Sequence, residues 1–553
     1  MNAQFFVTLS LAAASVSPLC SLSAQVPNGK IALETRIRKI ANNSHGLARV
    51  FEIGKTRSGA PILALAIQKE TPGRRNRPAL LLVAGLDGRR TQDSEVALEI
   101  AKEFVNQKAD TLKGRILQKW TLFVIPCANR DGQGAKVEGN LGPVDEDRDG
   151  QIDEDGPEDL DGDGRILWMR KKDPEGTYIQ DPKSGRMRKA DPEKGEAGIY
   201  KVWREGKDND GDGEFNEDPP GGIVPNRNFP HLYPEHGEGA GPYVLSEPES
   251  RSLAEFVIQH PRIRAVITLG AFDNLSGKAK RNTAARNSPI NGYEPRDKAA
   301  LASFAKAIKR KGNQGSDEWP GRFHAWVYAH AGRTSLALRI GKKKTKKSPP
   351  KSPSSKPAKK KKKDLEPSSR AIPKPERKKI FPWRPFNHPQ LGPVEIGGKD
   401  PLEDSKYSAE EQSKGVLLVS RLVEEVYKRA CDLRIVRMET KALGNGAMEL
   451  RAVVRNEGKE ASRTAIADRL RNPRQPRLEF VRYSRANPLS SKRWDKSEAQ
   501  NSLLTGRPFV FIPTHLLLGQ TSEFRWILKK PKPGTLGLRI VQEGFVFDIK
   551  EVK

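Results

Sequence analysis

The sequence predicts an α/β fold: a mixed, mostly parallel central sheet with helices on both faces, followed by a C-terminal β-sandwich. Two observations support this prediction. Apolar runs of buried-strand length alternate with amphipathic helical segments through most of the chain. Strands covered by helices on both faces of a sheet are apolar throughout. After Cys431 the pattern changes to short alternating runs, which are typical of antiparallel sheets.

The first elements are a helix and a hairpin. Residues 29–44 have helical periodicity, and two strand-like runs follow at 49–53 and 61–67. The segment 55–59, Lys-Thr-Arg-Ser-Gly, is a turn signal between them. Residues 79–84 then form a continuous apolar run, Ala-Leu-Leu-Leu-Val-Ala, which predicts the first buried strand.

Helix-start signals separate the next strands. Asp93 is expected to cap a helix that continues through Val105. Residues 120–126 predict the second buried strand. Ser246 and Glu249 match a capping box, which would open a helix to about residue 259.

Two more buried strands and one long helix complete the α/β part. The apolar runs are residues 263–269 and 335–340. Ser408 and Glu411 form a second capping-box pattern, which predicts a helix ending near Ala430.

The C-terminal part begins with a hairpin signal. Residues 433–439 and 448–454 alternate in polarity on either side of Gly444-Asn445-Gly446. Short loops of this composition favour tight hairpin turns. We therefore expect a β-sandwich over residues 431–553.

The remaining organisation follows from composition. Residues 1–24 are interpreted as a signal peptide, and residues 25–430 as the α/β domain. Two insertions interrupt that domain: an acidic, Gly-rich segment at 144–220 and a Lys/Ser/Pro-rich segment at 342–379. The second insertion is expected to be disordered.

The predicted signal peptide determines the expected location. An apolar run from Phe5 to Val16 is followed by small residues up to Ala24. This run is shorter than the roughly 20 apolar residues of a transmembrane helix, and no later segment is long enough to span a membrane. The protein is therefore expected to be secreted or periplasmic.

The basic charge is concentrated in one segment. The net charge is +29, and residues 342–379 hold 17 Lys and Arg against three acidic residues. A solvated, self-repelling linker explains this run without a specific nucleic-acid partner. Contact between the linker and an anionic polymer, such as a cell-wall polymer, stays open as an alternative.

Cysteine is scarce. Cys20 lies in the predicted signal peptide, which leaves Cys127 and Cys431. Two interpretations remain, a disulfide between them or two buried thiols, and we expect the thiols. A cysteine-rich metal site is excluded.

The acidic insertion contains a pattern that occurs three times, Asp-x-Asp-x-Asp-Gly. Oxygen ligands at positions 1, 3 and 5 with Gly at position 6 form the first half of a calcium loop. None of the three has Glu at position 12, so they are not EF-hands. We expect calcium to order this insertion; the alternative is a flexible acidic loop. The candidate ligands are Asp145, Asp147, Asp149, Asp153, Asp159, Asp161, Asp163, Asp208, Asp210, Asp212 and Asn216.

Several short pieces resemble the zinc carboxypeptidases of the carboxypeptidase A/B type, and they occur in the same order. Residues 54–62 are similar to the early hairpin of that family, and residues 125–132 to its Asn-Pro-Asp-Gly segment, with Arg130 where Pro is usual. Residues 226–230 match its Asn-Arg-Asn-Phe motif, and residues 246–249 its capped helix. The resemblance covers about residues 30 to 430, without the insertions.

The resemblance implies positions for three zinc ligands and a catalytic Glu, and all four are substituted here. Asp87 stands at the first His position and Arg90 at the following Glu position. Gly270 stands at the third ligand position, and Arg339 at that of the catalytic Glu. Glycine has no side chain, and a guanidinium does not bind a cation. Glu395 is the best candidate to replace the base.

The resemblance also implies that Asn226 and Arg227 bind the terminal carboxylate of a substrate. Both residues are present. We expect an ion pair of Asp87 with Arg339 or Arg90 to fill the space of the zinc. The arginines either close the pocket or make it a receptor for carboxylates, because Arg suits bidentate carboxylate binding.

Three functions are weighed. The leading interpretation is a secreted carboxypeptidase-like pseudoenzyme with calcium loops, calcium as the expected metal, and peptide C-termini or a cell-wall polymer as ligands. The second is an active zinc carboxypeptidase whose ligands lie elsewhere. The third is a surface adhesion or scaffold protein that binds through its C-terminal β-domain and its Lys-rich segment, with the peptidase fold as a spacer.

Overall fold

The computed structural model describes a large part of the chain. The described residues are 32–70, 77–144, 158–182, 185–209, 211, 213, 215, 222–277, 279–285, 287–310, 316–341, 380–400, 406–470, 475–481, 490–494, 503–504, 509–513, 516–529, 536–543 and 545–551. The predicted signal peptide and the Lys-rich segment 342–379 lie outside them.

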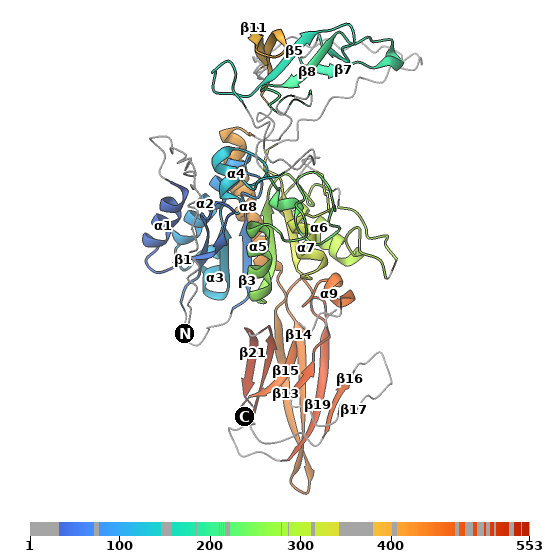
Figure 1. The fold of residues 1–553 in the computed structure, drawn as a ribbon. Helices are drawn as coiled ribbons and strands as arrows, with labels where there is room; N and C mark the ends of the chain where they lie inside the picture. The colour runs from blue at the N-terminus through green and yellow to red at the C-terminus, as the bar shows by residue number, and fades with distance from the viewer. Residues whose placement is uncertain are drawn as a thin grey trace, which may run out of the picture.

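A six-stranded mixed sheet forms the centre of the molecule (Figure 1). Its order is β1-β2-β4-β3-β9-β10. The strands are β1 (Ala48–Lys55), β2 (Pro61–Ile67), β3 (Ala79–Val83), β4 (Thr121–Ile125), β9 (Ile263–Leu269) and β10 (Thr334–Leu338). β3, β4, β9 and β10 are parallel, and β1 and β2 add an antiparallel edge. The predicted mixed, mostly parallel sheet is confirmed.

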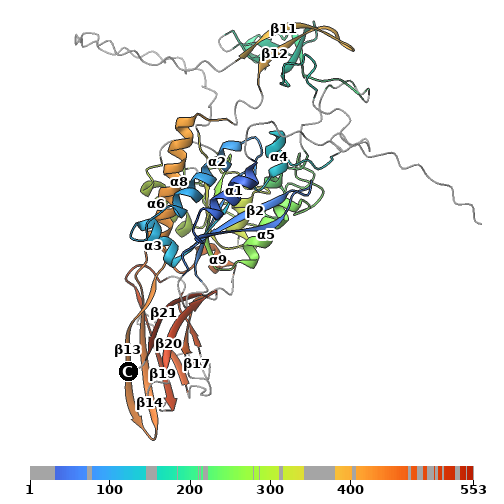
Figure 2. The same cartoon turned by 90° about the vertical axis from the view of Figure 1, so that its left-hand side faces the viewer.

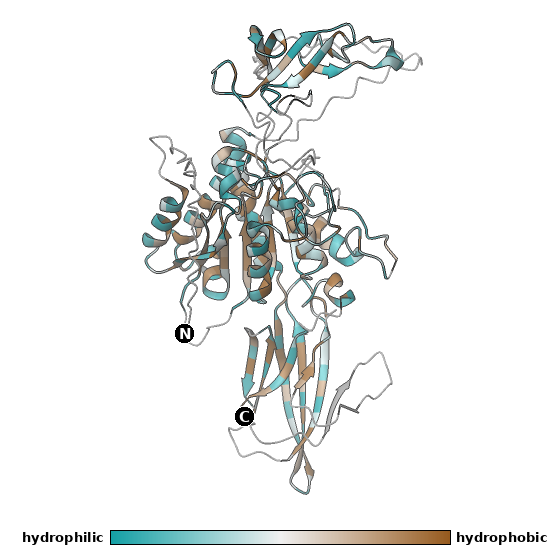
Figure 3. Cartoon of the chain, viewed as in Figure 1, coloured by the Kyte–Doolittle hydropathy of each residue, from teal (hydrophilic) through white to brown (hydrophobic). Residues whose placement is uncertain are grey.

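Helices cover both faces of this sheet, as the apolar strands predict. Along β2 and β3, side chains alternate between two hydrophobic clusters: Leu65 and Leu82 belong to one, Ala64 and Leu81 to the other. The described helices are α1 (Leu33–Asn42), α2 (Thr91–Val105), α3 (Leu112–Lys119), α4 (Arg130–Ala135), α5 (Pro248–Gln259), α6 (Pro295–Ala307), α7 (Phe323–Ala329) and α8 (Ala409–Arg429). α1, α2, α3, α6 and α8 pack on one face and α5 on the other, whereas α7 contributes side chains to both clusters. Figure 3 shows the hydrophobic strands between them.

A second sheet lies beyond one end of the central sheet (Figures 1 and 2). Its six strands have the order β11-β12-β5-β8-β6-β7. Four strands come from the acidic insertion: β5 (Trp168–Lys172), β6 (Tyr178–Gln180), β7 (Met187–Lys189) and β8 (Tyr200–Arg204). The other two, β11 (Ile380–His388) and β12 (Gly392–Lys399), follow the Lys-rich segment. We call this the insertion sheet.

The insertion sheet differs from the expected organisation. The expectation ended the second insertion at Lys379 and treated the two insertions as separate. In the structure β12 pairs with β5, with Ile396 opposite Met169. These two residues share a small hydrophobic cluster with Leu167 and Phe215. A strand must bury its apolar side chains, and the two excursions do so against each other.

Both insertions leave and re-enter the central domain at adjacent residues. The backbone N–H of Asn140 donates to the carbonyl of Ile223 at 2.9 Å. A Cβ at Gly341 would lie 2.8 Å from the Cβ of Tyr407, so the second excursion also closes on itself. Because each insertion begins and ends at one place, no strand of the central sheet comes from either insertion.

The C-terminal part is β-rich, as predicted. One sheet has the order β13-β14-β19-β16-β17 and the other β18-β15-β20-β21. The strands are β13 (Leu433–Gly444), β14 (Ala447–Asn456), β15 (Arg477–Val481), β16 (Ser490–Trp494), β17 (Leu503–Leu504), β18 (Phe509–Phe511), β19 (Thr521–Lys529), β20 (Gly537–Gln542) and β21 (Phe545–Glu551), with α9 (Ala465–Arg469) after β14. Both sheets contribute to one hydrophobic core that includes Leu450, Trp526 and Ile540.

Several local predictions are tested by the structure. The Ser408–Glu411 capping box opens α8 as expected. The Ser246–Glu249 box is wrong: Ser246 donates to the Glu247 side chain at 2.9 Å, and α5 starts at Pro248. Cys127 and Cys431 are both buried and free. In the part of the chain that is described, no helix is long and apolar enough to cross a membrane.

Candidate functional site

The candidate site lies at the carboxyl end of the parallel strands. In open α/β sheets, ligands bind where the loops after adjacent parallel strands meet. Here the loops after β3, β4, β9 and β10 meet at one edge, and the insertion sheet lies on that side of the molecule (Figure 2). The C-terminal β-rich part packs at the opposite edge, where Arg264 of β9 donates to the Ser462 carbonyl at 2.6 Å.

Asp87 does not form the expected ion pair with Arg90 or Arg339. Its carboxylate is buried and accepts two bonds from Arg89, Nε to Oδ1 at 3.0 Å and a terminal nitrogen to Oδ2 at 3.1 Å. Arg89 is two residues away in the same loop, so its guanidinium reaches the carboxylate without a second element. The expected pairing was wrong because it considered only substituted motif positions.

Arg90 forms its ion pair with Asp93. Its Nε donates to Oδ2 of Asp93 at 2.7 Å, and a terminal nitrogen donates to the Ile340 carbonyl at 3.1 Å. The Tyr407 hydroxyl also donates to Asp93, at 3.0 Å. Both members of the ion pair are almost completely buried. Arg90 and Asp93 therefore join the start of α2 to the segment before α8.

Gly270 and Arg339 leave space at the sheet edge. A Cβ at Gly270 would have no described heavy atom within 4 Å. Arg339 is half-buried and donates to the carbonyl of Ala271 at 3.2 Å. Its backbone N–H donates to Asp273 at 3.4 Å. No side chain among the described residues lies within contact distance of that Gly270 position.

Asn226 and Arg227 lie on the short 3-10 helix η2 (Pro225–Arg227), beside the N-terminus of α7. Asn226 accepts a bond from the Phe323 backbone N–H at 3.0 Å. Its backbone carbonyl accepts from Arg322 at 3.1 Å. One terminal nitrogen of Arg227 donates to the Glu238 carbonyl at 2.6 Å. Both expected carboxylate-binding residues therefore lie at the sheet edge, and Arg322 joins them.

Two of these arginines have unused donors. The Nε atoms of Arg227 and Arg322 are buried and have no hydrogen-bond partner among the described residues. Burial of Arg322 and the nearby charge of Arg227 lower the pKa of Arg322. Buried donors without an acceptor are costly, about 1–3 kcal/mol each. An anionic acceptor could satisfy both donors.

Sequence reasoning missed Glu138. This residue follows α4 and forms an ion pair with Arg89, through a terminal nitrogen that also donates to Asp87. Burial and the Asp87 charge raise the pKa of Glu138, while Arg89, Arg227 and Arg322 act in the opposite direction. The segment around Glu138 has no motif, so only the folded chain shows its position.

Glu395 is not at this site. It lies on β12 in the insertion sheet, where it accepts a bond from Nε of Arg170 at 2.8 Å. It therefore does not replace a base at the edge of the central sheet. The guanidinium of Arg170 also packs over Trp383 and Tyr200, at 4.2 and 4.8 Å from the ring centroids.

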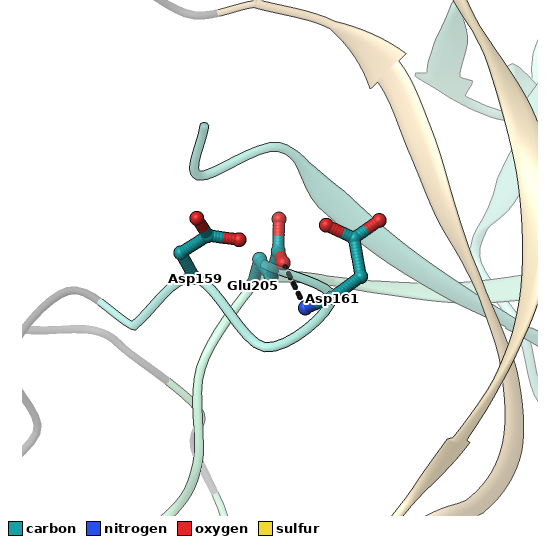
Figure 4. Close-up of side chains that lie close together, drawn as sticks. All are labelled: Asp159, Asp161 and Glu205. Carbon is teal, nitrogen blue, oxygen red and sulfur yellow. Dashed lines mark hydrogen bonds between the residues drawn. The ribbon is translucent and has the colours of Figure 1, made fainter. Parts of the chain in front are cut away.

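A separate group of carboxylates lies in the insertion. Ligand atoms of Asp159, Asp161 and Glu205 are all within 4.8 Å of one another (Figure 4). This is the one place in the described part of the chain where three or more His, Cys, Asp or Glu side chains could share a metal ion. Glu205 comes from the segment after β8, and its role was not predicted.

Backbone donors shape the loop around these carboxylates. Asp159 accepts from the N–H of Asp163 at 3.1 Å and of Gly164 at 2.7 Å. Glu205 is buried and accepts from the N–H groups of Leu160 and Leu167 at 2.9 and 2.7 Å. Both oxygens of Glu205 therefore help to hold the loop closed.

The third acidic loop begins in the same way. Asp208 accepts from the N–H of Gly211 at 2.6 Å and of Gly213 at 3.1 Å. These glycines have φ of 91° and 95°, a conformation that favours glycine. Of the other candidate ligands, Asp145, Asp147, Asp149, Asp153, Asp210, Asp212 and Asn216 lie outside the described residues.

A model of the zinc carboxypeptidase family matches residues 33–362. This match includes the central sheet, the site edge and the acidic insertion. The chain belongs to the zinc carboxypeptidase family. No curated protein sequence matches the chain.

Solved carboxypeptidase structures are among the structural neighbours. The thrombin-activatable fibrinolysis inhibitor is 13% identical; the alignment covers 56% of this chain and 65% of that chain, less than two thirds, with a TM-score of 0.36. The bovine form of that protein, in complex with tick carboxypeptidase inhibitor, is 12% identical. The alignment covers 72% of this chain and 96% of that chain, with a TM-score of 0.38. A metallo-carboxypeptidase from Burkholderia cenocepacia is 12% identical. The alignment covers 71% of this chain and 69% of that chain, with a TM-score of 0.33.

Proposed function

We propose that this zinc carboxypeptidase family member is a pseudoenzyme that binds carboxylates, such as peptide C-termini, at the edge of its central sheet. The observation that carries the proposal is two arginines, the buried Arg322 and the half-buried Arg227, each with a buried Nε that has no hydrogen-bond partner among the described residues. A carboxylate accepts two parallel bonds and suits guanidinium donors. It would also offset the repulsion between the two arginines.

The residues at the substituted positions do not fit zinc. A catalytic zinc site needs three protein ligands and an open position for water. Gly270 has no side chain, and Arg90 is held by Asp93. Both oxygens of Asp87 accept bonds from Arg89. The guanidinium of Arg89, and not a metal, supplies the positive charge that compensates Asp87 and Glu138.

The metal content of the purified protein tests the loss of zinc. After dialysis against dilute zinc, we expect well under one zinc per chain and no release of C-terminal residues from peptides. One zinc per chain together with peptidase activity would contradict the pseudoenzyme proposal.

Peptide binding tests the carboxylate pocket. A peptide with a free C-terminus should bind, and the same peptide with a C-terminal amide should not. Arg227→Ala should reduce affinity about tenfold or more, because a charge-assisted bond contributes about 1.5–3 kcal/mol. Arg421→Ala, an exposed change on α8, is the matched control. Equal binding of acid and amide would contradict the proposal.

We also propose that calcium binds in the insertion, at Asp159, Asp161 and Glu205. Three carboxylates within 4.8 Å repel one another unless a cation lies among them. Calcium prefers oxygen ligands, and Glu205 adds a carboxylate that the local sequence lacks at position 12. The predicted signal peptide, which favours secretion or export to the periplasm, is consistent with this proposal.

Calorimetric titration with calcium tests this second site. The wild type should bind calcium and melt at a higher temperature when it is present. Asp161→Asn should weaken that binding at least tenfold. Asp173→Asn changes a carboxylate of the same insertion outside the cluster and should have no effect. A melting temperature that does not respond to calcium would argue against the site.

A further inference from the structure

The structure brings a carboxylate, Glu138, to the arginines of the proposed pocket. Its ion pair with Arg89 joins the loop after α4 to the loop after β3. About a third of its side chain is exposed, at 34%. Two residues further on, the backbone N–H of Asn140 donates to the Ile223 carbonyl at 2.9 Å, shortly before η2, which carries Arg227. Glu138 therefore lies in the loop next to the segment that carries Arg227, and it also faces solvent.

The backbone holds Glu138 firmly in this place. The Asn129 side chain donates to the carbonyls of Glu138 and Gly139 at 3.1 and 2.7 Å. The neighbouring loop is in tight contact, because a Cβ at Gly88 would lie 2.4 Å from the Val137 carbonyl oxygen. Because its backbone is held in place, the negative charge of Glu138 stays at one position. A charge at one position can repel one kind of ligand and admit another, as selectivity requires.

The arginines near the proposed pocket differ in how far their positive charge is already paired. Arg89 is shared between two carboxylates, Asp87 and Glu138, so its charge is already compensated. Arg227 and Arg322 still have unused donors. The proposed pocket therefore offers positive charge for one carboxylate, and Asp87 and Glu138 add two carboxylates on the neighbouring loops.

We propose that Glu138 is a specificity-determining residue, which makes the pocket accept a peptide's terminal carboxylate but reject a last residue with an acidic side chain. This inference rests on the proposed carboxylate binding. A second ligand carboxylate would enter the space beside Asp87 and Glu138, and like charges repel. Neutral last residues avoid this cost.

Two peptides that differ only in the last residue, Ala or Glu, provide the test, with C-terminal amides as blanks. The wild type should bind the Ala-ending peptide about fivefold to tenfold more tightly, since one like-charge contact near a protein surface costs about 1 kcal/mol or more. Glu138→Gln should strengthen binding of both peptides and reduce the ratio to about twofold or less. Glu52→Gln, an exposed change on β1, is the matched control and should leave the ratio unchanged.

The outcomes separate the two proposals. If Arg227→Ala removes binding but Glu138→Gln leaves the ratio unchanged, the carboxylate pocket stands and the role of Glu138 is wrong. A wild type that prefers the Glu-ending peptide also overturns that role. If neither the wild type nor Glu138→Gln binds either peptide, both proposals fall. Equal melting temperatures of the wild type and Glu138→Gln would show that a change in peptide binding does not come from misfolding of the variant.

Discussion

Buried charged residues in this protein bind the nearest available partner, and this decides the candidate site. Arg90 is bound by Asp93, and Asp87 by Arg89. Each charge is buried or half-buried, so it needs a partner at hydrogen-bond distance. Asp87 and Arg90, at two of the substituted motif positions, therefore do not pair with each other. Each belongs to a separate ion pair. The nearby Arg227 and Arg322 keep an Nε donor without a partner among the described residues.

His231 is a second buried titratable residue near this site. Its Nδ1 lies 3.2 Å from Nε2 of His330. Burial, and then the neighbouring His330, lower the pKa of His231 to about 4. The pKa of His231 is lower in the folded state than in the unfolded state. The two states therefore bind different numbers of protons at the same pH, and the free energy of unfolding depends on pH.

We expect this histidine to make the protein acid-sensitive. Its folded pKa is lowered, so the unfolded state binds the proton first as the pH falls below about 6.5. Stability should fall between about pH 6.5 and pH 4, by about 3 kcal/mol at most, since each pKa unit is about 1.4 kcal/mol.

Urea unfolding at several pH values measures this loss. His231→Asn should flatten the dependence in that range. His45→Asn, an exposed change at a residue with positive φ that Asn tolerates, should not. An unchanged pH slope in His231→Asn would contradict the assignment.

At the level of elements, the family motifs serve as the scaffold of the site. Thr56 and Ser58 donate to Asp131 at 2.8 and 2.6 Å, which fixes the early hairpin on α4. The N–H of Arg57 donates to Glu249 of α5 at 2.9 Å. Short motifs that are far apart in sequence therefore meet in one buried network. This network positions the loops beside the site.

Loop packing beside the site is testable with two glycines. A Cβ at Gly88 would lie 2.1 Å from the backbone carbon of Gly132, whereas one at Gly134 would have no described heavy atom within 4 Å. Gly88→Ala should destabilise the protein by about 1–3 kcal/mol, as overpacking does. Gly134→Ala, in α4, should be neutral or stabilising by up to about 1 kcal/mol.

Denaturant unfolding of the two variants gives the comparison. Gly88→Ala should also weaken peptide binding, because its loop carries Asp87 and Arg89. If both glycines tolerate alanine equally, the close contact between the two loops is wrong.

In the whole molecule, the central sheet lies between two added parts. The insertion sheet lies beyond the carboxyl edge of the strands, and the C-terminal β-rich part beyond the other (Figure 1). A buried ion pair between Arg333 and Glu543, at 3.2 Å, joins the C-terminal part to the segment before β10. The exposed fractions of the two side chains are 4% and 5%, so water screens this pair little.

Loss of one partner of this pair should loosen the C-terminal part. Glu543→Gln should cost about 3–5 kcal/mol, because it removes a negative charge 3.2 Å from a buried guanidinium. Glu439→Gln breaks an exposed pair with Arg437 and should cost well under 1 kcal/mol.

Hydrogen exchange followed by mass spectrometry resolves the effect by region. In Glu543→Gln, exchange should rise first in β20 and β21 and later in the central sheet. Uniform protection in both parts would show that the ion pair does not couple them.

The sequence alone determined the six strands of the central sheet, the helices α1, α2, α5 and α8, the β-rich C-terminal part and the family resemblance, but not α3, α4, α6 and α7. These features follow from local periodicity and short motifs, which residues close in sequence specify. The tertiary structure decided which distant residues meet. Arg170 met Glu395, and Glu205 met Asp159, across elements that carry no shared local pattern. Glu138 and Arg322 joined the site for the same reason: a charged side chain binds the partner that the folded backbone brings within reach, and local sequence does not record that distance.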